Sequence, residues 1–235
     1  MSHRYAFALV FSLAMTCVAH ADFRIDYSAT RGHGDLGVLS LANGKLRAEP
    51  DRGSAHFDTS SSAILDPANA DLIVLDRAQH RYTRFDRETL NQVSGLASLL
   101  GAQDPLQLKV RPNGAHEQVS GHACDVYRID LFGEHYADYC MADARELGLS
   151  ASDIAQLKRG IDMAHDLLGC IGGNFATSVF AGGGLPVKLV SYRGGKVIGI
   201  SELKSVSTAK ISASEVAIPG GYREQPIDPL MFAPD

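Results

Sequence analysis

The sequence lacks the residue spacings on which most catalytic and metal-binding motifs depend. It has no Gly-x-Ser-x-Gly motif, so no serine is marked as the nucleophile of a hydrolase elbow. It also has no Cys-x-x-Cys or His-x-x-x-His spacing of the kind that holds zinc. We therefore expect a non-catalytic protein with no metal site and no cofactor.

Basic residues are not clustered along the chain. The 22 Lys and Arg residues are outnumbered by 27 Asp and Glu residues, and no run of four or more basic residues occurs. Polyanions are held by concentrated positive charge. The sequence therefore predicts that nucleic acids and anionic membrane surfaces are poor partners.

No hydrophobic run is long enough to cross a bilayer. The longest, at residues 5–19, has about 15 residues, which is short of the roughly 20 that a membrane helix needs. It follows a weakly positive head that contains Arg4, and the small-x-small sequence Ala19-His20-Ala21 comes next. This layout is typical of a secretory signal. We predict a signal peptide over residues 1–21, cleavage after Ala21, a periplasmic mature chain, and no transmembrane segment in that mature chain.

Three cysteines remain after the signal peptide, namely Cys124, Cys140 and Cys170. An oxidising compartment favours one bridge among them. We expect Cys124–Cys140, because both lie in adjacent strand-like segments; a bridge that uses Cys170 is the alternative. A two-residue turn at 133–134 would place Cys140 opposite Tyr127, so direct pairing of Cys124 with Cys140 needs a longer loop or a bulge.

Short segments of alternating or buried-type apolar residues predict an antiparallel meander. Asn43-Gly44 and Gly194-Gly195 are typical of two-residue hairpin turns, and residues 112–114 (Pro-Asn-Gly) predict a further turn. The expected strands cover residues 23–30, 38–41, 45–49, 63–65, 71–76, 80–85, 106–110, 124–131, 135–141, 186–193 and 196–203, with a further extension over 206–211.

Two helices interrupt the predicted meander. Asp86 caps the first, over residues 86–101, and Ser152 begins the second, which ends at Gly169, with Ser150 as the alternative cap. The apolar positions of each helix fall on one stripe, so each must cover an apolar surface. We predict an α+β protein with one domain over residues 22–235 and an irregular C-terminal tail from about residue 219.

Two further patterns have a structural and a functional interpretation. Residues 32–37 match Gly-x-Gly-x-x-Gly, but a strand-like segment follows where a nucleotide site needs a helix, so we interpret these glycines as turn residues. His116, His122 and His135 lie on strands near the expected bridge and would form a metal site if they converged with residue Glu134 or Asp138. Isolated surface histidines are commoner, and we expect those here.

Several short motifs follow the predicted signal peptide and together extend over most of the mature chain. They are Tyr82 at the end of an early hairpin, Gly121-His122-Ala123-Cys124-Asp125-Val126-Tyr127, Cys140 in the next strand, and Ile218-Pro219-Gly220-Gly221-Tyr222. In this combination they resemble a group of uncharacterised bacterial periplasmic proteins that share the fold of the lipoprotein carrier LolA.

The resemblance implies a strongly curved antiparallel sheet, an unclosed half-barrel, with helices that cover its concave face. In the carrier, that apolar cavity shelters acyl chains. We therefore expect a periplasmic binding or carrier protein for a lipid or acyl chain, with no catalytic role. The alternative is a cell-envelope interaction module with a filled core, whose partner is an envelope protein. The matching motifs are structural and assign no ligand-binding residue.

Overall fold

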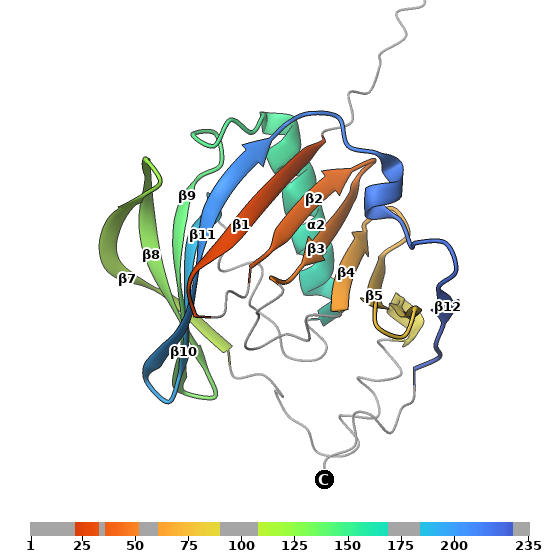
Figure 1. Ribbon diagram of the computed structural model, residues 1–235, viewed down its shortest axis with the longest axis horizontal. Helices are drawn as coiled ribbons and strands as arrows, with labels where there is room; N and C mark the ends of the chain where they lie inside the picture. Colours follow the sequence, from red (N-terminus) through yellow and green to blue (C-terminus); the bar gives the residue numbers. More distant parts are fainter. Residues whose placement is uncertain (1–21, 33–35, 52–60, 90–107, 169–183, 228–235) are drawn as a thin grey trace, which may run out of the picture.

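The computed structural model describes residues 22–32, 36–51, 61–89, 108–168 and 184–227. In these residues one sheet of twelve strands dominates the protein (Figure 1). Its strands are β1 (Phe23–Gly32), β2 (Val38–Ala42), β3 (Lys45–Glu49), β4 (Ser61–Asp66), β5 (Asp71–Asp76), β6 (Arg81–Phe85), β7 (Leu108–Val119), β8 (His122–Leu131), β9 (Glu134–Asp143), β10 (Gly184–Arg193), β11 (Lys196–Ser207) and β12 (Arg223–Glu224).

The strand order shows how two meanders are joined. From edge to edge it is β12-β6-β5-β4-β3-β2-β1-β11-β10-β9-β8-β7. Strands β1 to β6 form one antiparallel arm and β7 to β11 the other, and the antiparallel pairing of β1 with β11 connects them. The prediction of an antiparallel sheet is confirmed, and the sheet is open because β7 and β12 remain as separate edges.

Two predicted hairpin turns are present. Asn43 and Gly44 have φ values of 50° and 75°, and Gly194 and Gly195 have 55° and 71°, the left-handed conformations that a two-residue hairpin needs. The predicted turn at 112–114 is wrong. β7 continues through these residues, and its register against β8 shifts between Pro112 and His116, so the segment is a bulge.

The disulfide joins Cys124 and Cys140, whose Cα atoms lie 5.3 Å apart, as predicted. The turn between β8 and β9 is formed by residues 132–133, because Leu131 pairs with Glu134. A register shift beside Ile129 then brings Cys140 opposite Val126. The two cysteines are therefore not directly paired, and the bridge runs diagonally across the β8–β9 pair. The register shift places Cys140 on the face of β8 and β9 that Cys124 and Val126 share.

Helix α2 (Ala151–Leu168) packs on one face of the sheet and lies behind β2 and β3 in Figure 1. Its cap is Ser150, the alternative that the sequence allowed: the Asp153 N–H donates to Ser150 Oγ at 3.2 Å, and the Ser150 N–H donates to Asp153 Oδ2 at 2.6 Å. This reciprocal pair satisfies two otherwise unpaired N–H groups. Leu157 and Ile161 are buried in the main apolar cluster, so the predicted stripe does face the sheet.

The other predicted helix is described only at its start. Residues 87–89 are helical, and Asp86 Oδ1 accepts a hydrogen bond from the Thr89 N–H at 2.7 Å. Hydrogen bonding from Thr89 is the main reason that the pKa of Asp86 lies below its usual range. The remaining residues of that predicted helix, the predicted signal peptide over 1–21, Gly169 and Cys170 lie outside the described residues.

The sheet is strongly curled in the arm formed by β7 to β11. Strands β8 and β11 are three strand spacings apart in the order, which in a flat sheet corresponds to about 14 Å. Nevertheless, the hydroxyl of Ser120, in the β7–β8 turn, donates to the Leu203 carbonyl oxygen on β11 at 3.4 Å. Val119 and Leu203 are buried in the same apolar cluster. The end of the β7–β8 hairpin therefore folds over β9 and β10 toward β11.

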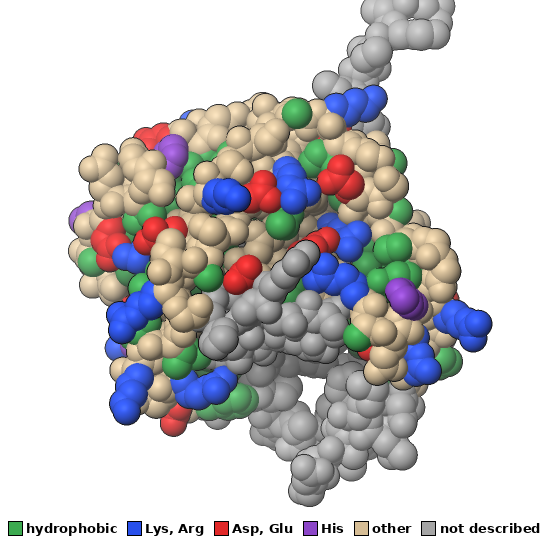
Figure 2. Space-filling model, viewed as in Figure 1, with side chains coloured by type: hydrophobic (Ala, Val, Ile, Leu, Met, Phe, Trp, Pro, Cys, Tyr) green, Lys and Arg blue, Asp and Glu red, His purple; other side chains and the backbone are tan. Residues whose placement is uncertain are grey.

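The face opposite α2 carries charge on the first strands. Arg24 pairs with Asp26 at 3.0 Å and with Glu215 at 3.3 Å, while Arg47 pairs with Glu49 at 2.9 Å. Figure 2 shows acidic and basic side chains alternating across this face. Since Phe23, Ile25 and Leu41 are buried on the other face, these strands have the one-sided pattern typical of antiparallel sheets.

The C-terminal segment is more regular than predicted. The 3-10 helix η2 (Ala213–Val216) packs on β2 and β3 through Val216. Beyond residue 219, β12 then adds to β6 in parallel, with the Arg223 N–H donating to the His80 carbonyl oxygen at 3.0 Å. Two residues suffice for this strand because it only covers an edge, where pairing removes exposed backbone groups.

Candidate functional site

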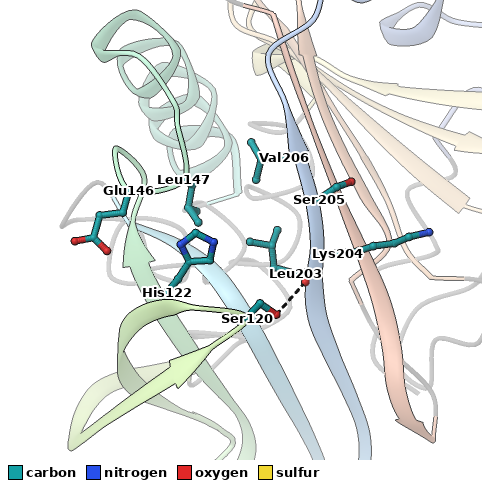
Figure 3. Close-up of a pocket in the computed structure, with 8 residues that line it drawn as sticks. All are labelled: Ser120, His122, Glu146, Leu147, Leu203, Lys204, Ser205 and Val206. Atoms are coloured by element: carbon teal, nitrogen blue, oxygen red, sulfur yellow. Dashed lines mark hydrogen bonds between the residues drawn. The ribbon is translucent and has the colours of Figure 1, made fainter.

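A hollow lies where the curled hairpin end meets β11. Its volume is about 280 Å³. The β7–β8 turn and the start of β8 form one wall, the loop after β9 forms the second, and the end of β11 forms the third (Figure 3). The lining residues are Ser120, His122, Glu146, Leu147, Leu203, Lys204, Ser205 and Val206.

The floor of the hollow is apolar and continues into the core. Leu147 and Leu203 are buried members of the main cluster, and Val206 packs against that cluster while partly exposed. In Figure 3 these three side chains and the His122 ring surround the middle of the hollow. An apolar group placed there would therefore extend the core of the protein, and its apolar surface would be removed from water.

The rim of the hollow is polar. Glu146 and Lys204 are exposed and stand on opposite sides of it (Figure 3). Within the described residues, neither of these side chains, nor that of His122, forms a hydrogen bond or ion pair. In Figure 3 the His122 ring faces the middle of the hollow, whereas the charged ends of Glu146 and Lys204 point outward from its edges. Chemically, the hollow suits an amphiphile of modest size.

A second polar cluster lies at the other end of β8 to β10. His135 Nε2 lies 2.9 Å from Asp138 Oδ1, and the Tyr192 hydroxyl donates to Asp138 Oδ2 at 2.9 Å. The rings of His135 and Tyr192 stack with their centroids 3.9 Å apart. Burial, and then the hydrogen bond to the Asp138 carboxylate, raise the pKa of Tyr192 to about 12, so this phenol remains a neutral donor.

Next to this cluster, Asp130 bridges two arginines. Its carboxylate lies 2.7 Å from Arg128 Nε and 2.9 Å from Arg111 Nη2. Burial alone would raise the pKa of Asp130, but the Arg128 hydrogen bond and both guanidinium charges outweigh it and hold that pKa below its usual range. Arg128 follows Cys124 and Val126 on the same face of β8, so the apolar part of that face ends at this ion cluster.

The three histidines singled out from the sequence do not converge. His135 meets Asp138, as the sequence suggested for one pair, whereas His116 lies 2.6 Å from Asp125 and His122 lines the hollow. Among the described residues, no group of three or more His, Cys, Asp or Glu side chains is arranged to hold a metal ion. Nor does any helix in the described part of the chain have the length and apolar character needed to cross a membrane.

The described residues of 32–37 support the interpretation that these glycines are turn residues and do not form a nucleotide site. Gly32 ends β1 with φ of 59°, and a strand, β2, follows Gly37. Sequence reasoning did not find the hollow, because His122 and Leu203 are far apart in the chain and meet only through the curl of the sheet. The sole sequence signal near it was the motif at 121–127.

Comparisons with known proteins give only distant likenesses. No family model matches the chain, and no curated protein sequence matches it. An uncharacterised conserved protein from Thermus thermophilus aligns at 6% identity over 88% of this chain and 89% of its own, with a TM-score of 0.41. PNGF-II aligns at 10% identity over 90% of this chain and 32% of its own (TM-score 0.48), and MucB at 10% identity over 85% of this chain and 58% of its own (TM-score 0.28).

The chain thus spans 32% of the PNGF-II structure and 58% of the MucB structure. All three TM-scores are below 0.5, so these likenesses support no inference about what the protein does, and they place it in no family.

Proposed function

We propose that this protein is an exported, non-catalytic binding protein of the cell envelope, and that the hollow takes one group of an amphiphilic, lipid-like ligand. The observation that carries the proposal is the combination of an apolar floor that continues into the core with His122, Glu146 and Lys204 around the rim. The disulfide supports export, because such bonds persist in oxidising compartments.

The size of the hollow limits the ligand. About 280 Å³ is slightly less than the roughly 300–1,000 Å³ of pockets that enclose a drug-sized molecule. The apolar face of β8 also ends at the Arg128–Asp130 pair, which would oppose a long alkyl chain in that direction because ions are costly to desolvate. The hollow therefore fits a headgroup with the first part of a chain, and an entire lipid would extend beyond it.

Native mass spectrometry of the purified exported protein, together with lipid extraction, tests this proposal. Val206→Trp would fill the hollow from a partly exposed position, and Val197→Trp on the same strand β11 is the matched control outside it. We expect bound lipid or acyl-probe binding in the wild type and in the control, with loss in Val206→Trp. Absence of lipid and of probe binding in the wild type would refute the proposal.

A second candidate is a protein-interaction module of the envelope with a filled core. It is favoured by the packing between α2 and the sheet, where Leu157 and Ile161 share the main cluster with Leu46 and a Cβ on Gly160 would lie 3.7 Å from Leu46. The long edge strand β7, exposed from Arg111 to Gln118, would be the surface for an envelope protein. Crosslinking in the intact envelope tests this candidate. A partner protein crosslinked through β7, together with no acyl-probe binding in the hollow, would favour it over the first candidate.

A further inference from the structure

Phe132 occupies a position that neither packing nor turn chemistry explains. It is 60% exposed and is the one large exposed hydrophobic side chain among the described residues. Its φ is 52°, in the left-handed region that bulky L-residues rarely adopt. The first positions of the other two-residue turns hold Asn43, Ser120 and Gly194, all small or polar. Strain retained at an exposed phenylalanine indicates that the side chain is needed where it stands.

The turn that carries Phe132 lies at a basic end of the sheet. Leu108 pairs with Leu131, which puts the start of β7 beside this turn, and the β10–β11 turn lies at the same end, since β9 starts where β10 finishes. Figure 1 shows the β8–β9 and β10–β11 turns next to each other. The exposed basic residues of this end are Lys109, Arg111, Arg193 and Lys196. With Phe132 they form what we call the basic tip.

The charge of the basic tip differs from that of the molecule. The whole chain has a formal net charge of −5, whereas the four exposed basic side chains of the tip stand beside one exposed acidic residue, Glu134. Arg128, Asp130 and Asp138, which lie at the same end, are partly or fully buried. Figure 2 shows Lys and Arg side chains gathered at this end, with hydrophobic atoms among them. The residues come from three separate parts of the chain, which is why a search for contiguous basic runs did not find them.

We propose that the basic tip docks on an anionic phospholipid surface, with Phe132 inserted at the boundary between headgroups and acyl chains. Anionic headgroups complement the surrounding lysines and arginines, and an aromatic ring on a turn that projects from the sheet can enter the interface without unfolding the protein. A single aromatic residue and a few cations give reversible, salt-sensitive binding. The inference does not depend on the hollow, which lies at the opposite end of β8.

The first measurement is co-sedimentation of the purified protein with vesicles of phosphatidylcholine that contain phosphatidylglycerol, compared with phosphatidylcholine alone. We expect binding only to the anionic vesicles and its loss at high salt. Lys196→Glu should weaken binding by at least roughly fivefold, the effect of removing one basic residue from an anionic surface. Lys210→Glu is the matched control, because it makes the same charge change at an exposed site beyond the end of β11, away from both the tip and the hollow. Equal losses in both variants would show a general charge effect and overturn the proposal.

The second measurement separates the ring from the fold. Phe132→Asn creates an Asn-Gly turn, which suits the same backbone, so the variant should fold normally and bind roughly tenfold less well. Because the chain has no tryptophan, Phe132→Trp introduces a single tryptophan whose emission should shift to shorter wavelength on anionic vesicles. Wild-type binding by Phe132→Asn, or a tryptophan emission that anionic vesicles leave unchanged, would overturn the proposal.

Discussion

Removal of the Cys124–Cys140 disulfide should lower the stability of the protein by an amount that can be worked out from the fold. The two cysteines are separated by 16 positions in the sequence. In the chain-entropy model, closure of a loop of this length stabilises the native state by about 3 kcal/mol at 25 °C. Both cysteines are buried, at 5% and 2% exposure, so truncation also removes packing atoms. We therefore expect Cys124→Ala/Cys140→Ala to lose roughly 3–5 kcal/mol.

Urea unfolding monitored by far-UV circular dichroism measures this loss. For a domain of this size, about 3 kcal/mol also corresponds to a fall in Tm of roughly 6–12 °C. Cys170→Ala keeps the bridge and serves as the control for the loss of a cysteine as such. A double variant within about 1 kcal/mol of the wild type would refute the reasoning, because it would mean that the unfolded chain is already restricted without the bond.

Three other changes have expected outcomes. Phe132→Asn should raise the free energy of unfolding by about 1 kcal/mol, since Asn tolerates the left-handed turn better than Phe; an unchanged or lower urea midpoint would contradict the strain. The pKa of Asp130 is depressed in the folded protein, so its pairing with Arg128 stabilises above the unfolded pKa and is lost as pH falls through the folded value. Asp130→Asn should accordingly be destabilised relative to the wild type at neutral pH, with the difference shrinking toward acidic pH, and a constant difference in urea titrations would argue against this. Tyr192→Phe removes the donor to Asp138 and should cost roughly 0.5–1.5 kcal/mol, whereas the wild type should lose this stabilisation as pH rises through about 12; alkaline unfolding curves that coincide for both proteins at all pH values would count against the hydrogen bond.

Local chemistry explains why much of the strand arrangement could be predicted. Asn43-Gly44 and Gly194-Gly195 adopt positive φ at little cost, so each specifies a hairpin without help from the rest of the fold. The alternation of apolar Phe23, Ile25 and Tyr27 with polar residues likewise predicts, from neighbouring residues alone, a strand with one buried face. The cap at Asp86 also depends only on neighbours in the chain.

Cross-strand pairing explains two departures from local turn preference. Residues 112–114 have typical turn composition, yet β8 supplies a continuous partner on both sides of them, and the ladder absorbs the extra residues as a bulge. The register of β8 and β9 makes position 132 the first turn position, although the residue there, Phe132, has poor turn propensity. Pairing across strands outweighed local preference in both places.

The amino-acid sequence by itself determined the antiparallel meander and the amphipathic helix, because each depends on neighbours within a few residues or on adjacent strands. It favoured the Cys124–Cys140 bridge and offered two caps for the helix, and the structure decided both. Only the tertiary structure decided the order of the two arms, the hollow between His122 and Leu203, and the gathering of Lys109, Arg193 and Lys196 around Phe132. These features arise from the β1–β11 pairing and the curl of the sheet, which bring together residues that no spacing along the chain connects.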